Sequence, residues 1–192
     1  MSRIILASSS PYRKELLGRL HLEFDTASPD IDESPLANET PSQLVQRLAT
    51  NKANAIAEKV MNCIIIGSDQ VAVCDDIILG KPGNYENAVK QLQSLSGKRV
   101  CFHTGLSVIS TSDAHIQTDE VKFFVEFRTL SDSMIKNYLT KEPAFNCAGS
   151  FKSESLGIAL TSRMLGPDPT SLIGLPLIRL TEMLEEAGVE IV

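Results

Sequence analysis

The stretch that decides the fold is Cys63-Ile64-Ile65-Ile66-Gly67-Ser68-Asp69-Gln70. Its four apolar residues are typical of a strand that is buried on both faces, as in the parallel sheet of an α/β protein. The strand is expected to end at Gly67-Ser68-Asp69-Gln70, before an apolar run resumes over residues 71–74. A polar residue that closes such a strand is exposed at one edge of the sheet, so Asp69 is predicted to lie there.

The sequence before this strand predicts two βα units. Ile4–Ala7 is a short apolar run, and Pro11 suits the first turn of a helix that carries Leu16, Leu17 and Leu20. Residues 24–27 predict a second strand, and residues 28–40, with two prolines and four acidic residues, predict an irregular loop. Pro41 then begins a helix that is expected to last until about Lys59, because apolar residues recur at the i, i+3, i+4 spacing.

The sequence after this strand predicts an antiparallel addition to the sheet. Asp75-Asp76 indicates a turn into a return strand, and two long strands are expected over residues 100–110 and 121–128, joined near Asp113. Helices are predicted over residues 84–95, 131–140 and 176–187. The fold class is therefore α/β, with a mixed central sheet, flanking helices and an antiparallel strand extension. Residues 1–192 are expected to form one domain, either a single body or two lobes around a cleft.

Composition and charge exclude several classes of protein. The chain has 192 residues, of which 43% are hydrophobic and 22% charged, so it is neither disordered nor of low complexity. Its net charge of −6 argues against a nucleic-acid polymer or an anionic membrane surface as partner. No apolar run exceeds four residues, whereas a membrane span needs about 20. Because strand-like residues start at Ile4, no secretory signal is expected. We expect a cytoplasmic protein.

Cysteine and histidine offer no metal or disulfide pattern. The four cysteines contain no CxxC pair, and the three histidines have no ligand spacing, so buried reduced thiols are expected. Any metal would be held by oxygen ligands, which favours Mg²⁺ or Mn²⁺.

A phosphate site is predicted at the turn between the first strand and the first helix. Ser8-Ser9-Ser10 supplies hydroxyl and backbone N–H groups, and Arg13 and Lys14 supply positive charge beside a helix N-terminus. The alternative is that Ser10 only caps the helix and both cations are solvated.

Two acidic residues, Asp69 and Glu33, are further candidates for this site. Asp69 could hold Mg²⁺ or accept a proton from water, and Glu33 could reach the same ion if its loop folds over the end of the sheet. A buried ionised carboxylate without a partner would cost several kcal/mol, and Lys52 and Lys81 are available as partners. Each lysine also has an ordinary explanation as a surface residue, and Asp30 and Asp32 are expected to be solvated.

The ordered series of motifs resembles the Maf nucleotide pyrophosphatases from Ile4 to about Leu184. The matching motifs are Leu6-Ala7-Ser8-Ser9-Ser10-Pro11-Tyr12-Arg13, Asp32-Glu33, Arg47-Leu48-Ala49 with Lys52-Ala53, Ile66-Gly67-Ser68-Asp69-Gln70, Gly80-Lys81-Pro82, His103-Thr104-Gly105 and Ala148-Gly149-Ser150-Phe151. The resemblance implies hydrolysis of a nucleoside triphosphate between its α and β phosphates with a divalent metal. It implies that Asp69 is the proton acceptor and that phosphates and metal are held by Ser8, Arg13, Glu33, Lys52 and Lys81.

The selectivity positions of that family fall on Tyr12, Gln70 and Glu154. The dTTP/UTP branch carries Arg and Thr at the first two, so the chain resembles the YceF-like branch, the 7-methyl-GTP pyrophosphatases. The cationic 7-methylguanine would stack on the Tyr12 ring, a contact of roughly 0.5–2 kcal/mol. Glu154 could accept hydrogen bonds from the N1–H and N2–H groups of guanine.

Three alternatives accompany this interpretation. Asp69 could be chiefly a metal ligand rather than a base. The enzyme could prefer dTTP or UTP. The chain could also be a nucleotide-sensing module that binds a triphosphate without hydrolysing it. The expected partner is a small-molecule nucleotide, and a homodimer is a candidate assembly.

Overall fold

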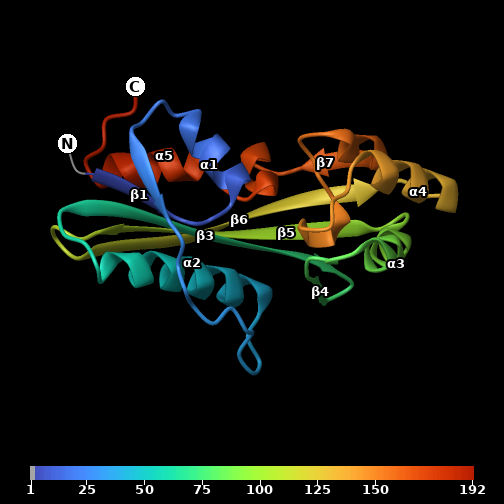
Figure 1. Cartoon of the computed structure of the whole chain (residues 1–192), viewed down its shortest axis with the longest axis horizontal. Coiled ribbons are helices and arrows are strands. Elements are labelled where there is room, and N and C mark those ends of the chain that lie inside the picture. The colour runs from blue at the N-terminus through green and yellow to red at the C-terminus, as the bar shows by residue number, and fades with distance from the viewer. Residues whose placement is uncertain (1–2) are drawn as a thin grey trace. The chain divides into compact units, whose positions relative to one another are not determined.

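The computed structural model describes residues 3–192, which divide into two compact units. The first unit comprises the described residues up to Gln70, with Thr104–Val121 and Asp168–Val192. The second comprises Val71–His103 and Lys122–Pro167. One seven-stranded sheet has the order β2-β1-β3-β5-β6-β7, with β4 paired to β3 (Figure 1).

Three long strands carry residues of both units: β3 (Cys63–Cys74), β5 (Arg99–Ser110) and β6 (His115–Phe127). The other elements of the first unit are β1 (Arg3–Ala7), α1 (Pro11–Gly18), β2 (Phe24–Ala27), α2 (Pro41–Ala57), the 3₁₀ turn η3 (Pro169–Ile173) and α5 (Leu177–Glu186). The other elements of the second unit are β4 (Ile77–Leu79), α3 (Tyr85–Leu95), α4 (Asp132–Lys141), η1 (Ala148–Ser150), η2 (Leu156–Leu160) and β7 (Thr161–Leu165).

In the first unit, β1 pairs in parallel with both β2 and β3, and Leu6 lies opposite Ile66. Alternate residues of these strands point to opposite faces of the sheet. Ile64 and Ile66 pack with α1 and α5 on one face, whereas Ile65 packs with α2 on the other. Figure 1 shows α1 and α5 above the sheet and α2 below it. The apolar run is therefore buried on both faces, as predicted.

Two glycines set the close approach of α2 to the sheet. A Cβ atom on Gly67 of β3 would lie 2.1 Å from the carbonyl oxygen of Ala49, and one on Gly105 of β5 would lie 2.2 Å from that of Val45. Both contacts are with helix backbone, which cannot move aside as a side chain can. Any larger residue at either position would push α2 away from the strands.

Gly67→Ala is expected to lower the free energy of unfolding by about 3 kcal/mol, because overpacking must displace a helix. For a chain of this length, this corresponds to a fall in Tm of about 6–12 °C. Gly18→Ala is the matched control, since its added Cβ would meet nothing within 4 Å. Thermal unfolding of both variants checks the expectation, and an unchanged Tm in Gly67→Ala would contradict this account of the packing.

The second unit contains the predicted antiparallel extension. Asp75 and Asp76 both have positive φ, 49° and 63°, and they turn β3 into β4, whose Ile78 lies opposite Val73. Asparagine and aspartate tolerate this left-handed conformation better than most residues. At one edge of the sheet, β7 pairs antiparallel with β6.

Most predicted elements are confirmed, with four corrections. The long apolar strand does not end at Gly67 but runs unbroken through Asp69 to Cys74, so Asp69 lies within β3. β6 begins at His115 rather than Val121, α1 ends before Leu20, and β7 was not predicted. β3 continues because its polar residues have internal partners: the hydroxyl of Ser68 donates to the carbonyls of Gly105 (2.8 Å) and Gly174 (2.9 Å).

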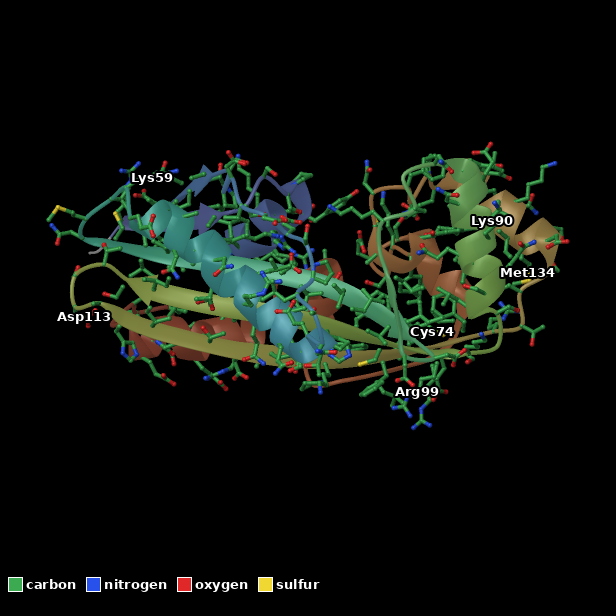
Figure 2. The ribbon with its side chains drawn as sticks, turned by 90° about the horizontal axis from the view of Figure 1, so that it is seen from below. Lys59, Cys74, Lys90, Arg99, Asp113 and Met134 are labelled. Atoms are coloured by element: carbon green, nitrogen blue, oxygen red, sulfur yellow. The ribbon has the colours of Figure 1, made fainter. Side chains whose placement is uncertain are left out.

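The turn predicted near Asp113 joins β5 to β6, and Asp113 is labelled in Figure 2. None of the four cysteines, all within the described residues, forms a disulfide. Within residues 3–192, no helix combines the length and the apolar character that a bilayer span requires.

Candidate active site

A lysine and two carboxylates form the centre of the site. The ammonium Nζ of Lys52 lies 2.6 Å from Oδ1 of Asp69 and 2.8 Å from Oε1 of Glu33. Lys52 is 6% exposed and Asp69 is 7% exposed, whereas the side chain of Glu33 is 58% exposed. Asp69 is therefore buried rather than exposed at the edge of the sheet as predicted, and Lys52 supplies the partner that its burial requires.

Helix and strand periodicity place this pair together. Residues 49, 52, 53 and 56 of α2 are buried on the side that faces the sheet. Asp69 lies two residues beyond Gly67 on the same face of β3, next to the point of closest approach of α2. Glu33 reaches the same ammonium group that Asp69 contacts, whereas a metal ion shared by the two carboxylates stays a prediction.

The serine turn after β1 brings a second cation. Ser8 is buried, and its Oγ lies 3.4 Å from NH1 of Arg13 and 3.2 Å from the backbone nitrogen of Ser10. Ser10 is the N-cap of α1, as the alternative interpretation held, and Pro11 occupies the first turn. Arg13 is not solvated, because its Nε donates to the carbonyl of Gly174 at 2.8 Å.

Electrostatics connect Arg13 to the carboxylates. Burial lowers the pKa of the Arg13 guanidinium, and the negative charges of Asp69 and Glu33 oppose that change. Arg13 therefore lies in the field of the carboxylates that Lys52 contacts. The cations and carboxylates gather where β1 ends, and the carboxyl ends of parallel strands are where ligands bind in open α/β sheets.

Sequence reasoning missed Asp168, a 2% exposed carboxylate that organises the segment facing Arg13. Its Oδ1 accepts hydrogen bonds from the backbone nitrogen (2.8 Å) and the hydroxyl (2.6 Å) of Thr170, and its Oδ2 accepts one from the backbone nitrogen of Ile178 (2.8 Å). These bonds hold both ends of the segment between Thr170 and Ile178, which contains the Gly174 carbonyl that accepts from Arg13. Asp168 followed by Pro169 is a helix-start signal in the sequence.

Asp168→Asn is expected to lower the free energy of unfolding by about 3 kcal/mol. An amide presents N–H groups where the carboxylate accepts, so a buried backbone N–H loses its partner. A fall in Tm of about 6–12 °C, measured by circular dichroism, would agree with this role. Asp25→Asn, at an exposed ion pair with Arg3 in the same unit, serves as the control. Equal Tm values for Asp168→Asn and Asp25→Asn would contradict this structural role of Asp168.

The predicted selectivity residues and Lys81 come from different segments of the chain. Gln70 points to the opposite face of β3 from Asp69, and its Nε2 donates to the carbonyl of Ser171 (2.6 Å) and to Oγ1 of Thr104 (3.0 Å). Tyr12 is half-buried in the first turn of α1. Lys81 and Glu154 are exposed residues of the second unit, so their convergence with the first unit stays a prediction.

Two carboxylates of the site could serve as donors for a metal. Within residues 3–192, no group of three or more His, Cys, Asp or Glu residues could hold a metal ion by itself. Glu33 and Asp69 nevertheless direct one oxygen each toward a single point, where the Lys52 ammonium lies. Two carboxylates are a donor set that Mg²⁺ accepts when phosphate oxygens of a substrate complete its coordination.

Comparison with known proteins identifies the family. Residues 3–187 match the family model described as "Maf-like protein". The chain is 53% identical over 191 residues to the 7-methyl-GTP pyrophosphatase of Pseudomonas aeruginosa, covering 100% of both chains. It is 54% identical to the 7-methyl-GTP pyrophosphatase of Idiomarina loihiensis, covering 97% of this chain and 95% of that one. It is 53% identical to the one of Nitrosococcus oceani, covering 96% and 93%. The chain therefore belongs to the Maf family.

Proposed function

We propose that the protein is a hydrolase that converts 7-methyl-GTP into 7-methyl-GMP and pyrophosphate by cleaving the α–β phosphoanhydride. The observation that carries the proposal is the buried Lys52–Asp69 pair, with Glu33 and Arg13 beside it. Phosphoryl transfer needs cations to hold phosphates and carboxylates to position a water or a metal, and this site offers both. Relatives of about half-identical sequence carry the corresponding name over nearly their full length.

In this proposal Asp69 accepts a proton from the water that attacks the α phosphorus. Arg13 and Lys52 hold the phosphate oxygens and offset the negative charge that develops on them in the transition state. Arg13 is held in place for this task by the Gly174 carbonyl, and Ser8 supplies a hydroxyl beside it. Lys81 of the second unit is proposed to add a further cation to the phosphates.

A divalent metal, Mg²⁺ or Mn²⁺, would be held by Glu33 and Asp69 together with phosphate oxygens of the nucleotide. When bound, it supplies positive charge to the phosphates and assists departure of pyrophosphate. Lys52 contacts both carboxylates, so its ammonium would have to share these oxygens with a bound metal or move away from them. A shift of Lys52 away from Asp69 would free a carboxylate oxygen of Asp69 to act on water.

Base selectivity is proposed to rest on Tyr12 and Glu154, with Gln70 in a supporting role. The Tyr12 ring would stack on the cationic base, and Glu154 would accept from its N1–H and N2–H groups. Gln70 donates to the carbonyls of Ser171 (2.6 Å) and Leu172 (3.3 Å), which fixes the turn that follows Asp168. We therefore propose that Gln70 acts on selectivity by shaping this turn.

The test is pyrophosphate release from 7-methyl-GTP, GTP, dTTP and UTP in the presence of Mg²⁺ or Mn²⁺. We expect the highest kcat/KM with 7-methyl-GTP. A preference for dTTP or UTP would keep the reaction but contradict the selectivity proposed for Tyr12 and Glu154. No release from any of the four would favour a nucleotide-sensing module that binds without turnover.

A further inference from the structure

The loop that carries Glu33 is tied to α2 by Arg47, in addition to the ion pair between Glu33 and Lys52. Residues 28–36 have no helix or strand of their own. The side chain of Arg47, on α2, donates through Nε to Oε1 of Glu39 (2.5 Å) and through NH2 to Oε2 of Glu39 (2.8 Å). The same NH2 group donates to the carbonyl oxygen of Ser34 at 3.0 Å. Arg47 therefore holds the loop at two points.

The Glu39 end of this tie is firmly fixed. The side chain of Glu39 is 6% exposed, and its Oε2 also accepts from the backbone nitrogen of Leu36 (3.0 Å). The Arg47 guanidinium lowers the pKa of Glu39 to about 2, so the pair stays ionised at neutral pH. Thr40 and Gln43 form a capping box directly after it, which anchors the chain to the first turn of α2.

The Ser34 end lies next to Glu33. More than half of the Glu33 side chain is exposed, so packing alone contributes little to its position. Lys52, which Glu33 contacts, lies on the same helix as Arg47, and a helix keeps the two side chains at a fixed spacing. The negative charge of Asp69 also reaches Arg47, which places the arginine within the electrostatic range of the site.

We propose that Arg47 is a positioning residue: by holding Ser34 and Glu39 it sets the Glu33 carboxylate beside Lys52 and Asp69. Arginine suits this task because its planar fork binds a carboxylate with two bonds and still reaches a third acceptor. The inference rests on the proposed function in one respect, namely that Glu33 serves there as a metal ligand.

The test uses Arg47→Met, Arg47→Lys and, as control, Arg179→Met, which removes ion pairs to Asp119 and Glu182 elsewhere in the first unit. Loss of an outer residue that orients a ligand costs about 10-fold or more in metal affinity. We expect Arg47→Met to raise the half-saturating Mg²⁺ concentration about 10-fold, with kcat at saturating Mg²⁺ near that of the parent. The half-saturating Mg²⁺ concentration of Arg47→Lys should lie between those of the parent and Arg47→Met, and that of Arg179→Met should equal the parent's.

A double variant separates positioning from a general loss of stability. In a Glu33→Gln background, adding Arg47→Met should cause no further loss of Mn²⁺ affinity, measured by electron paramagnetic resonance on the nucleotide-free protein. Hydrogen exchange at the backbone amide of Leu36 should become faster in Arg47→Met. Full additivity of the two substitutions, or an unchanged metal requirement in Arg47→Met, would overturn the proposal. Because Mn²⁺ binding and hydrogen exchange need no turnover, a failure of the proposed reaction would leave this test intact.

Discussion

Asp69→Asn is expected to lower kcat about 1000-fold, because general-base catalysis contributes about 10²–10⁴-fold in typical enzymes. Asparagine has nearly the same shape but cannot accept the proton of the attacking water. Lys52 keeps its second partner, Glu33 at 2.8 Å, so the variant should remain folded. Steady-state kinetics and circular dichroism of the same preparation measure the two quantities.

Asp25→Asn, which removes an exposed carboxylate of β2, is the matched control and should retain the parent rate. Near-full activity in Asp69→Asn would remove this residue from the mechanism. Because the proposal makes Asp69 both base and metal ligand, the variant should also bind metal more weakly, and its kcat should stay low at saturating metal. A kcat that returns to the parent value at saturating metal would make Asp69 chiefly a metal ligand.

Lys52→Met is expected to lower kcat/KM by about 10²–10³-fold, the typical cost of removing one group that stabilises transition-state charge. The same substitution should strengthen binding of Mn²⁺ to the nucleotide-free protein, because Glu33 and Asp69 lose the cation that now lies between them. An affinity gain of at least about 10-fold corresponds to about 1.4 kcal/mol. Electron paramagnetic resonance measures the Mn²⁺ affinity directly.

Thermal unfolding gives a second measure of the competition between the Lys52 ammonium and Mn²⁺ for the two carboxylates. Without metal, Lys52→Met should unfold at a lower temperature than the parent, because breaking a buried ion pair leaves an uncompensated charge. Added Mn²⁺ should restore part of the loss, since a ligand that binds only the folded state stabilises it. Lys59→Met, at an exposed lysine just beyond the end of α2 (Figure 2), is the control. Weaker Mn²⁺ binding in Lys52→Met than in the parent would contradict the proposed competition.

The fold could be predicted where one local signal decided each element. Pro11, Pro41 and Ser131 each stand at or next to the start of a helix, and the structure begins helices at Pro11, Pro41 and Asp132. The extent of β3 could not be predicted, because polar residues usually mark a strand's end. Here the hydroxyl of Ser68 donates to the carbonyl of Gly174, directly after η3, and Asp69 accepts from Lys52 on α2. These tertiary contacts decide where the strand ends.

The site could be predicted in composition but not in arrangement. Burial of Asp69 required a cation, and Lys52 was one of two lysines named for it. Asp168 and Arg47 were not assigned roles, because their partners lie in other segments: Asp168 acts through the turn that holds Arg13, and Arg47 acts through Ser34 and Glu39. A single sequence gives no information on the distance between residues of different segments.

The position of bond cleavage tests the central claim most directly. Hydrolysis of 7-methyl-GTP in water enriched in oxygen-18, followed by mass spectrometry of both products, reports which phosphorus the water attacks. The account predicts one labelled oxygen in 7-methyl-GMP and none in the pyrophosphate. Label in the pyrophosphate, or release of inorganic phosphate in its place, would contradict attack at the α phosphorus by a water that Asp69 activates.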